Sequence, residues 1–219
     1  MTYLVLGQRP WARWAFEQMR DWPGVWQYCA EVENVPVVVE QLQPAKIFVL
    51  HWSAKVPAEI VKQYECINFH IGNLPDGRGG SPLQNLIVRG IRQTELCALR
   101  MTEEFDAGPV YLRVPVSLEG TAEEVYLRAM GKAVGMCWRI VQDKPEPVPQ
   151  EGKGRVFARR TPEQSRIPAV ETREQLYDHL RMLDAEGYPH AFLEHQGCRY
   201  EFCRVTLTTA GIRAEVLIT

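Results

Sequence analysis

The chain has 219 residues, of which 46% are hydrophobic and 24% are charged, and its formal net charge is −2. This length and composition fit one soluble globular domain, or one domain with a small additional unit. The sequence pI near 6.2 argues against a nucleic-acid binder that works through bulk positive charge. A small anionic ligand held by one or two arginines is compatible with it.

Targeting and cysteine patterns predict a cytoplasmic protein without a metal. The first seven residues lack the basic start of a secretory signal, and no apolar run approaches the length of a membrane span. The six cysteines form no CxxC pair and show no zinc-ligand spacing. We therefore expect reduced cysteines packed as small hydrophobic residues, no membrane contact and no metal site.

The first third of the chain alternates short apolar runs with segments of helical spacing. Buried strands are expected at residues 2–6, 47–50 and 66–69, and helices at residues 11–20 and 57–63. Pro10 and Pro57 suit helix starts, because the fixed φ of proline matches the first helical turn. Residues 22–31 look irregular, and residues 36–40 are expected to be a short strand or part of a connection.

The middle of the chain continues this alternation. A helix is expected at residues 82–89, and strands at residues 93–101 and 110–116. Thr121 and Glu124 form a capping box for a helix that runs toward Val141. Its buried stripe is expected to be Leu127, Met130, Val134, Cys137 and Val141. Strands alternating with helices predict an α/β fold with a Rossmann-like, mostly parallel sheet, although the dinucleotide-binding pattern G-x-G-x-x-G is absent.

A proline- and glycine-rich segment, residues 145–154, separates this region from the C-terminal part. Residues 157–162 are expected to be extended and are basic. Beyond them we expect a helix over residues 172–185 and strands at residues 191–194, 199–206 and 213–218. The sequence therefore predicts one main domain over residues 1–164 and a small α+β unit over residues 165–219.

Polar side chains follow three of the expected strands. Asn68 and His70 alternate with Phe69, so an extended strand points both to the same side, at the strand end where open α/β sheets bind ligands. His51-Trp52-Ser53 and residues 103–106 follow other strands, and a doubly wound sheet would bring Asp106 near His70. Such a pair can act as a general acid and base, and an amide can stabilise negative charge. Each residue alone is more often structural, but together they favour an active site.

Several short motifs in this region resemble one enzyme family. Asn68-Phe69-His70, then Leu74-Pro75, Arg78-Gly79 and Pro82, and later Asp106-Ala107-Gly108-Pro109 resemble the N10-formyltetrahydrofolate-dependent formyltransferases. That family includes methionyl-tRNA formyltransferase, glycinamide ribonucleotide formyltransferase and the sugar N-formyltransferases. The resemblance implies that residues 1–164 are the formyltransferase catalytic domain.

The resemblance also implies roles for particular residues. Asn68, His70 and Asp106 would be catalytic: Asn68 and protonated His70 would stabilise the oxyanion that forms when an amine attacks the formyl carbon, and His70 with Asp106 would move protons. No metal would take part. The pterin of N10-formyltetrahydrofolate, the formyl-donor cosubstrate, would lie against the backbone of two loops, which contain Trp52, Ser53, Ala54, Thr102, Glu103, Glu104 and Phe105.

A second resemblance concerns the acceptor. The run from Gly79 to Asn85 and the tail from Arg181 to Pro189 resemble nucleotide-sugar N-formyltransferases of the pseudaminic and related nonulosonic acid type, which act in glycan biosynthesis. The expected acceptor is therefore the amine of a nucleotide-linked amino-dideoxy sugar of the UDP-4-amino type, with no nucleic acid as partner. Candidate acceptor-binding residues are Arg9, Arg78, Gly79, Gly80, Ser81 and Gln84, with Lys55, Arg159 and Arg160 as further candidates for a diphosphate.

Three alternatives stay open at this point. The same reaction could act on aminoacyl-tRNA or on a small ribonucleotide amine. The chain could also be a catalytically silent module that binds folate or a nucleotide, although such a module would not need an acid/base pair. A separate question is the oligomeric state: members of the family often form dimers, so the resemblance also implies that a homodimer is possible.

Overall fold

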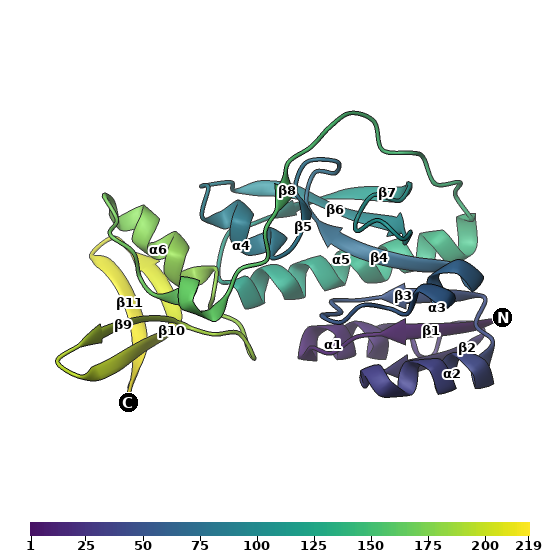
Figure 1. The fold of residues 1–219 in the computed structure, drawn as a ribbon, viewed down its shortest axis with the longest axis horizontal. Coiled ribbons are helices and arrows are strands. Elements are labelled where there is room, and N and C mark those ends of the chain that lie inside the picture. Colours follow the sequence, from purple (N-terminus) through teal and green to yellow (C-terminus); the bar gives the residue numbers. More distant parts are fainter.

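The computed structural model describes all 219 residues, and its main element is a six-stranded sheet with the order β2-β1-β3-β4-β6-β7 (Figure 1). Its strands are β1 (Thr2–Leu6), β2 (Val25–Cys29), β3 (Lys46–Val49), β4 (Cys66–Ile71), β6 (Gln93–Arg100) and β7 (Val110–Ser117). Neighbouring strands from β2 to β4 are parallel, and β6 is antiparallel to both β4 and β7. The predicted mostly parallel α/β sheet is therefore confirmed, with β6 as the single reversed strand.

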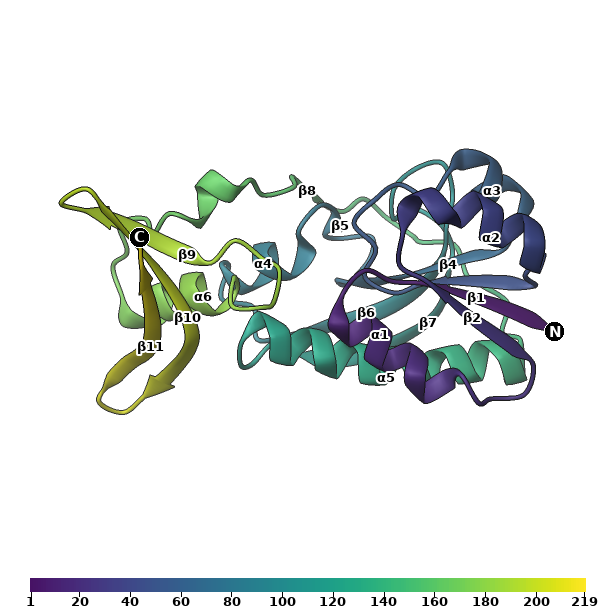
Figure 2. The ribbon, with the colours of Figure 1, turned by 90° about the horizontal axis from the view of Figure 1, so that it is seen from below.

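Helices cover both faces of this sheet because the strands in its centre carry apolar residues on both sides. Tyr3 and Val5 of β1 pack with α1 (Pro10–Met19) and α5 (Ala122–Asp143). Leu4 and Leu6 pack with α2 (Val35–Leu42) and α3 (Ala58–Gln63) on the other face. Figure 2 shows α1 and α5 together on one side of the sheet and α2 and α3 on the other.

Two expected elements near the N-terminus are wrong. Residues 25–29 form the edge strand β2, whose Trp26 is buried with its ring centroid 5.8 Å from that of Phe48. Aromatic density there reflects packing against the sheet rather than irregular chain. Residues 36–40 lie inside α2, preceded by a short 3₁₀ turn at Val32–Asn34. The valine-rich sequence favoured a strand, but Val35 and Val39 are four residues apart and bury one helical face.

Helix α5 begins at the predicted capping box, in which Thr121 Oγ1 accepts from the backbone of Glu124. Its buried stripe differs from the predicted one. Leu127 is 42% exposed, whereas Met130 and Cys137 are buried as expected. The buried face also contains Val125, Tyr126, Ala129, Ala133, Met136 and Ile140. The small side chains on this face let the helix lie close to the sheet, and they gave little hydrophobic signal in the sequence.

The C-terminal part forms a second, smaller unit at one end of the molecule (Figure 1). It contains α6 (Arg173–Arg181) and a three-stranded antiparallel sheet in the order β11-β10-β9. These strands are β9 (Ala191–His195), β10 (Cys198–Thr208) and β11 (Gly211–Ile218). Apolar residues of this unit join the same core cluster as α1 and α5, so the two parts share buried surface. A domain boundary at residue 164 stays a prediction.

Between α5 and the C-terminal unit, residues 145–161 run back across the main domain; we call this segment the strap (Figure 1). Its short strand β8 (Val156–Phe157) pairs in parallel with β5 (Arg78–Gly79), which precedes α4 (Pro82–Ile87). A 3₁₀ turn at Pro162–Ser165 follows the strap. All six cysteines are free, and none of the helices has the length and apolar character needed to cross a membrane.

Candidate active site

Strand β4 presents different side chains to its two faces. Ile67, Phe69 and Ile71 pack into the core beneath α1 and α5. Asn68 and His70 point to the opposite face, as the strand alternation predicts. On that face the helices α2 and α3 cover β1 and β3, whereas two loops cover the end of β4. We call residues 72–81 the glycine-rich loop and residues 101–109 the acidic loop.

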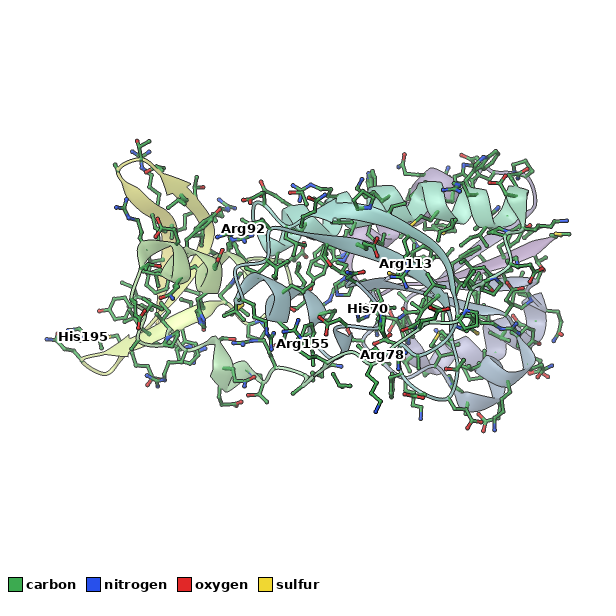
Figure 3. The ribbon with its side chains drawn as sticks, turned by 90° about the horizontal axis from the view of Figure 1, so that it is seen from above. His70, Arg78, Arg92, Arg113, Arg155 and His195 are labelled. Carbon is green, nitrogen blue, oxygen red and sulfur yellow. The ribbon has the colours of Figure 1, made fainter.

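The side chains of Asn68, His70 and Asp106 form one group. Asn68 Nδ2 donates to Asp106 Oδ1 over 3.2 Å, and His70 Nδ1 lies 3.4 Å from Asp106 Oδ2. His70 Nε2 lies 2.9 Å from the carbonyl oxygen of Gly77. The backbone N–H of Gly79 donates to Asp106 Oδ2 over 3.0 Å. The His70 side chain is 4% exposed and the Asp106 side chain 10%, and Figure 3 shows His70 in the middle of the molecule.

This geometry prepares the histidine to take up a proton. The Gly77 carbonyl can only accept, so His70 carries a hydrogen on Nε2, and the neutral ring then presents a lone pair on Nδ1 to a carboxylate oxygen. Burial lowers the pKa of His70, and the Asp106 carboxylate and the Gly77 carbonyl oppose that shift. A proton placed between Nδ1 and Oδ2 converts two facing lone pairs into a charge-assisted hydrogen bond.

Asp106 lies beside His70, as predicted, but not because parallel strands end at the same edge of the sheet. Because β6 is antiparallel to β4, it ends beside the start of β4, where Met101 N donates to the Cys66 carbonyl. The acidic loop then turns back along β4, with Asp106 at φ 53°. Gly108 packs so tightly that a Cβ there would lie 1.8 Å from a backbone oxygen of β6. The meeting of strand ends in a parallel sheet therefore does not explain this contact.

The glycine-rich loop lies under the strap, which holds it against the catalytic candidates. A Cβ at Gly79 would lie 2.5 Å from a strap carbonyl oxygen, and one at Gly80 would lie 2.5 Å from the Cα of Arg159. Gly79 also has φ +100°, which favours glycine. Ser81 Oγ accepts from the backbone of Arg160. These three residues are thus packed beneath the strap, and their role toward an acceptor stays a prediction.

Two other residues expected to bind the acceptor face inward. The Arg78 guanidinium donates to the side-chain oxygen of Gln150 over 3.1 and 2.9 Å and lies 3.6 Å from Glu104. Gln84 is 3% exposed and donates to the Tyr126 hydroxyl, so it lies in the core and not in a cleft. In this structure both side chains hold protein segments together.

Gln150 itself had no signal in the sequence. Its Nε2 donates to the carbonyl oxygens of Asp106 over 2.7 Å and Gly108 over 2.8 Å. In the sequence it is one glutamine after Val148 and Pro149, in a segment with the composition of a linker. Only the folded strap brings it to the acidic loop.

The loops expected to bind the folate donor lie side by side. Lys55 Nζ lies 5.9 Å from the centroid of the Phe105 ring, and Lys62 of α3 pairs with Glu103 at 2.7 Å. Residues 102–105 are exposed. The indole Nε1 of Trp52 is buried without a hydrogen-bond partner, which an acceptor on a bound ring would satisfy. These features fit a pterin site, and the contacts of Ser53, Ala54, Thr102 and Glu104 with a donor stay predictions.

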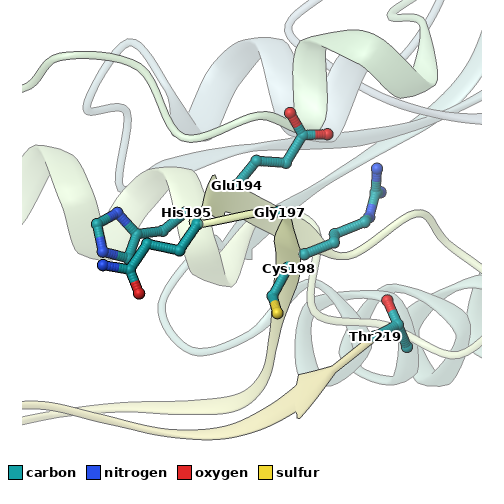
Figure 4. A pocket seen from close by; sticks show the side chains of 7 residues that line it. Glu194, His195, Gly197, Cys198 and Thr219 are labelled. Atoms are coloured by element: carbon teal, nitrogen blue, oxygen red, sulfur yellow. The ribbon is translucent and has the colours of Figure 1, made fainter.

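Arg9 lies apart from this group, in a cavity of about 430 Å³ at the start of α1. Its Nη1 donates to the Gly187 carbonyl, and its guanidinium lies 5.0 Å from the centroid of the Tyr188 ring. Its Nε is buried without a partner. Another hollow, of about 370 Å³, lies at the turn between β9 and β10 and against Thr219 (Figure 4). It shares no residue with the His70 group.

His51, predicted to lie at the same sheet edge, belongs to a separate, partly buried network. The Trp11 indole N–H donates to His51 Nδ1 over 2.8 Å, so the neutral ring carries its hydrogen on Nε2 and donates to the Tyr188 hydroxyl over 2.7 Å. Tyr188 is 3.1 Å from the Tyr126 hydroxyl, to which Gln84 also donates. This network joins the C-terminal part of the chain to α1 and α5.

The His51 network makes stability depend on pH. Burial, with a smaller contribution from the Arg9 charge, lowers the pKa of His51 from 6.5 to about 3. Above pH 6.5 the ring is neutral in both folded and unfolded chains; as the pH falls further only the unfolded chain gains the proton, which favours unfolding. The wild-type free energy of unfolding should therefore fall by about 2 kcal/mol between about pH 7 and about pH 5 through this group.

Urea unfolding at both pH values measures this change. His51→Asn should remove that part of the pH dependence, and asparagine tolerates the φ of 53° at this position. His195→Asn, at the exposed end of β9, is the matched control and should keep the wild-type slope. Equal slopes in wild type and His51→Asn would contradict the assignment.

No three His, Cys, Asp or Glu side chains of the chain lie where they could hold a metal ion together.

Residues 162–219 match the family model described as methionyl-tRNA formyltransferase, C-terminal domain. Methionyl-tRNA formyltransferase of Bacillus cytotoxicus is 31% identical over 155 residues, which make up 65% of this chain and 48% of that protein. The chain thus spans about half the length of the curated relatives it matches.

Solved structures extend the similarity to the whole chain. A structure of methionyl-tRNA formyltransferase from Clostridium thermocellum has a TM-score of 0.96 and 35% identity, and the match covers 100% of this chain and 99% of that one. A sugar N-formyltransferase from Shewanella has a TM-score of 0.63 and 18% identity, over 92% of this chain and 96% of that one, which shows a shared fold. The chain therefore belongs to the formyltransferase family that includes methionyl-tRNA formyltransferase.

Proposed function

We propose that this protein transfers a formyl group from N10-formyltetrahydrofolate to an amine. The observation that carries this proposal is the hydrogen-bonded group of Asn68, His70 and Asp106 at the end of β4, in a chain of this family. The paired loops after β3 and β6, with the unpartnered Trp52 indole, support the folate donor. The donor supplies an activated formyl group; the chain's residues position it and handle charge and protons.

Each member of the group has a distinct task. Asn68 uses one amide N–H for Asp106 and keeps the other for the negative charge that develops on the formyl oxygen. The attacking amine must lose a proton, and N10 of the folate must gain one as the bond between N10 and the formyl carbon breaks. His70 Nδ1, whose lone pair faces Asp106, is suited to receive the first proton and to return it to N10. The protonated ring then adds a positive charge close to the developing negative charge.

The acceptor favoured by the relatives is an aminoacyl-tRNA. The relatives with 31% and 35% identity are named methionyl-tRNA formyltransferases, whereas the sugar N-formyltransferase is 18% identical and supports the fold alone. The sequence-based preference for a nucleotide-linked amino sugar thus gives way to the alternative. Aminoacyl-tRNA becomes the first candidate.

The nucleotide sugar stays the second candidate because of charge. A net charge of −2 is unusual for a protein that binds a polyanion such as tRNA. A single diphosphate needs fewer cations, and Arg9, which forms no ion pair, lies in a cavity that Arg13 and Glu186 also line.

Purified protein should be incubated with N10-formyltetrahydrofolate and, separately, methionyl-tRNA, a UDP-4-amino sugar and a small ribonucleotide amine. We expect tetrahydrofolate release and a formylated product with one of them, and methionyl-tRNA is expected first. Transfer to tRNA should weaken steeply as salt rises, because binding releases counterions. If tetrahydrofolate is released with none of the three acceptors, the result contradicts formyl transfer and favours a binding module.

A further inference from the structure

Gln150 ties together three segments that meet at the candidate active site. It comes from the strap, its side-chain N–H groups bind carbonyls of the acidic loop, and its oxygen binds Arg78 of the glycine-rich loop. The amide can donate two hydrogen bonds and accept two. All four are used at 2.7 to 3.1 Å, so the orientation of this side chain is fixed from both ends.

The two carbonyls that Gln150 binds belong to Asp106 itself and to Gly108, two residues further along the same turn. Asp106 has φ 53°, a backbone conformation that a residue with a Cβ rarely keeps without support. Holding the carbonyls of Asp106 and Gly108 restrains the backbone of this turn, and with it the direction in which the Cα–Cβ bond of Asp106 leaves the chain. That direction places the carboxylate on Asn68, His70 and the Gly79 N–H.

We propose that Gln150 is a positioning residue for formyl transfer, holding Asp106 where its carboxylate supports the proton on His70. The inference rests on the proposed function for its effect on rate, but its effect on His70 is a property of the folded protein alone. Gln150 contacts neither Asn68 nor His70 through any hydrogen bond, so it acts through the backbone of the acidic loop.

Two variants separate the contacts of Gln150. Gln150→Leu removes all four hydrogen bonds with little change in volume. Gln150→Glu keeps oxygens for Arg78 but places a carboxylate against two carbonyls to which it cannot donate. Arg155→Gln is the matched control: it breaks the 2.6 Å ion pair between Arg155 and Asp76, which also ties the strap to the glycine-rich loop, and leaves Gln150 intact.

Titration of the His70 ring by NMR measures positioning without requiring turnover. The Asp106 carboxylate raises the pKa of His70, so its displacement should lower that pKa. In Gln150→Leu the midpoint should fall by about one unit, since an opposite charge within ~4–6 Å shifts a pKa by roughly one to three units. Arg155→Gln should keep the wild-type midpoint. An unchanged midpoint in Gln150→Leu overturns the proposal.

Kinetics provide the second measurement. In Gln150→Leu and Gln150→Glu, kcat should fall by about tenfold to hundredfold with KM within about threefold, the signature of misplaced catalytic groups. Arg155→Gln should keep both constants. Wild-type kinetics in Gln150→Glu would show that the Arg78 contact suffices and would overturn positioning of Asp106. If the wild-type protein formylates none of the acceptors, the proposed function fails, and the His70 midpoint alone decides the role of Gln150.

Discussion

Asp106→Asn should lower kcat by roughly two to four orders of magnitude, the range associated with loss of general acid–base catalysis. The carboxylate accepts from the Gly79 N–H and the Asn68 amide and faces His70 Nδ1. An asparagine brings an N–H₂ against the N–H donors of Gly79 and Asn68 and removes the negative charge that supports a proton on His70. The pKa of the ring should fall further, and the proton of the attacking amine loses its destination.

The fold should tolerate Asp106→Asn, because Asn68 can rotate its amide and offer an oxygen where it now offers an N–H. Steady-state kinetics and thermal unfolding, measured on the same preparations, separate the two effects. Asp21→Asn changes an exposed aspartate with the same chemistry and should leave both unchanged. A loss of rate below tenfold in Asp106→Asn, or an equal loss in Asp21→Asn, would show that Asp106 does not belong to the reaction.

A local pattern in the sequence predicted two residues of the candidate active site, Asn68 and His70. Asn68 and His70 had to share a face, because two polar residues separated by one position on a strand always do. Their partner could be predicted only as a residue near a strand end. We expected Asp106 near His70 because parallel strands end at one edge of a sheet. Strand β6 is reversed, however, so the acidic loop turns back along β4 to bring Asp106 to His70. The correct residue thus followed from the family motif more than from topology.

What the sequence could not predict depends on contacts between distant segments. Gln150 reaches Asp106 across 44 positions, and His51 reaches Tyr188 across 137. Neither residue stands in a periodic pattern, and polar side chains in a linker or after a strand are usually solvated. The prediction for residues 36–40, which lie in α2, was wrong for a related reason. β-branched residues favour strands locally, whereas burial of one face against the sheet selects a helix.

Arg181→Leu should destabilise the protein by about 3–5 kcal/mol, because it removes one partner of a buried ionic network. Arg181 is 0% exposed and donates to Asp178 over 2.7 Å and to the carbonyls of Leu118 and Gly120. Leucine fits the apolar part of the space. It leaves the buried carbonyl of Leu118 and the partly buried carbonyl of Gly120 without this donor, and Asp178 with Arg92 as its remaining ion-pair partner.

The size of this effect tests whether the C-terminal unit unfolds together with the main domain. Arg181 joins α6 to the turn between β7 and α5, so its loss should lower one cooperative urea transition rather than split it. Arg173→Leu, an exposed change at the start of the same helix, should alter stability by less than about 0.5 kcal/mol. Two separate transitions in Arg181→Leu would mean that this network is the main coupling between the two sheets. A loss below about 1 kcal/mol would mean that water replaces the arginine at those carbonyls.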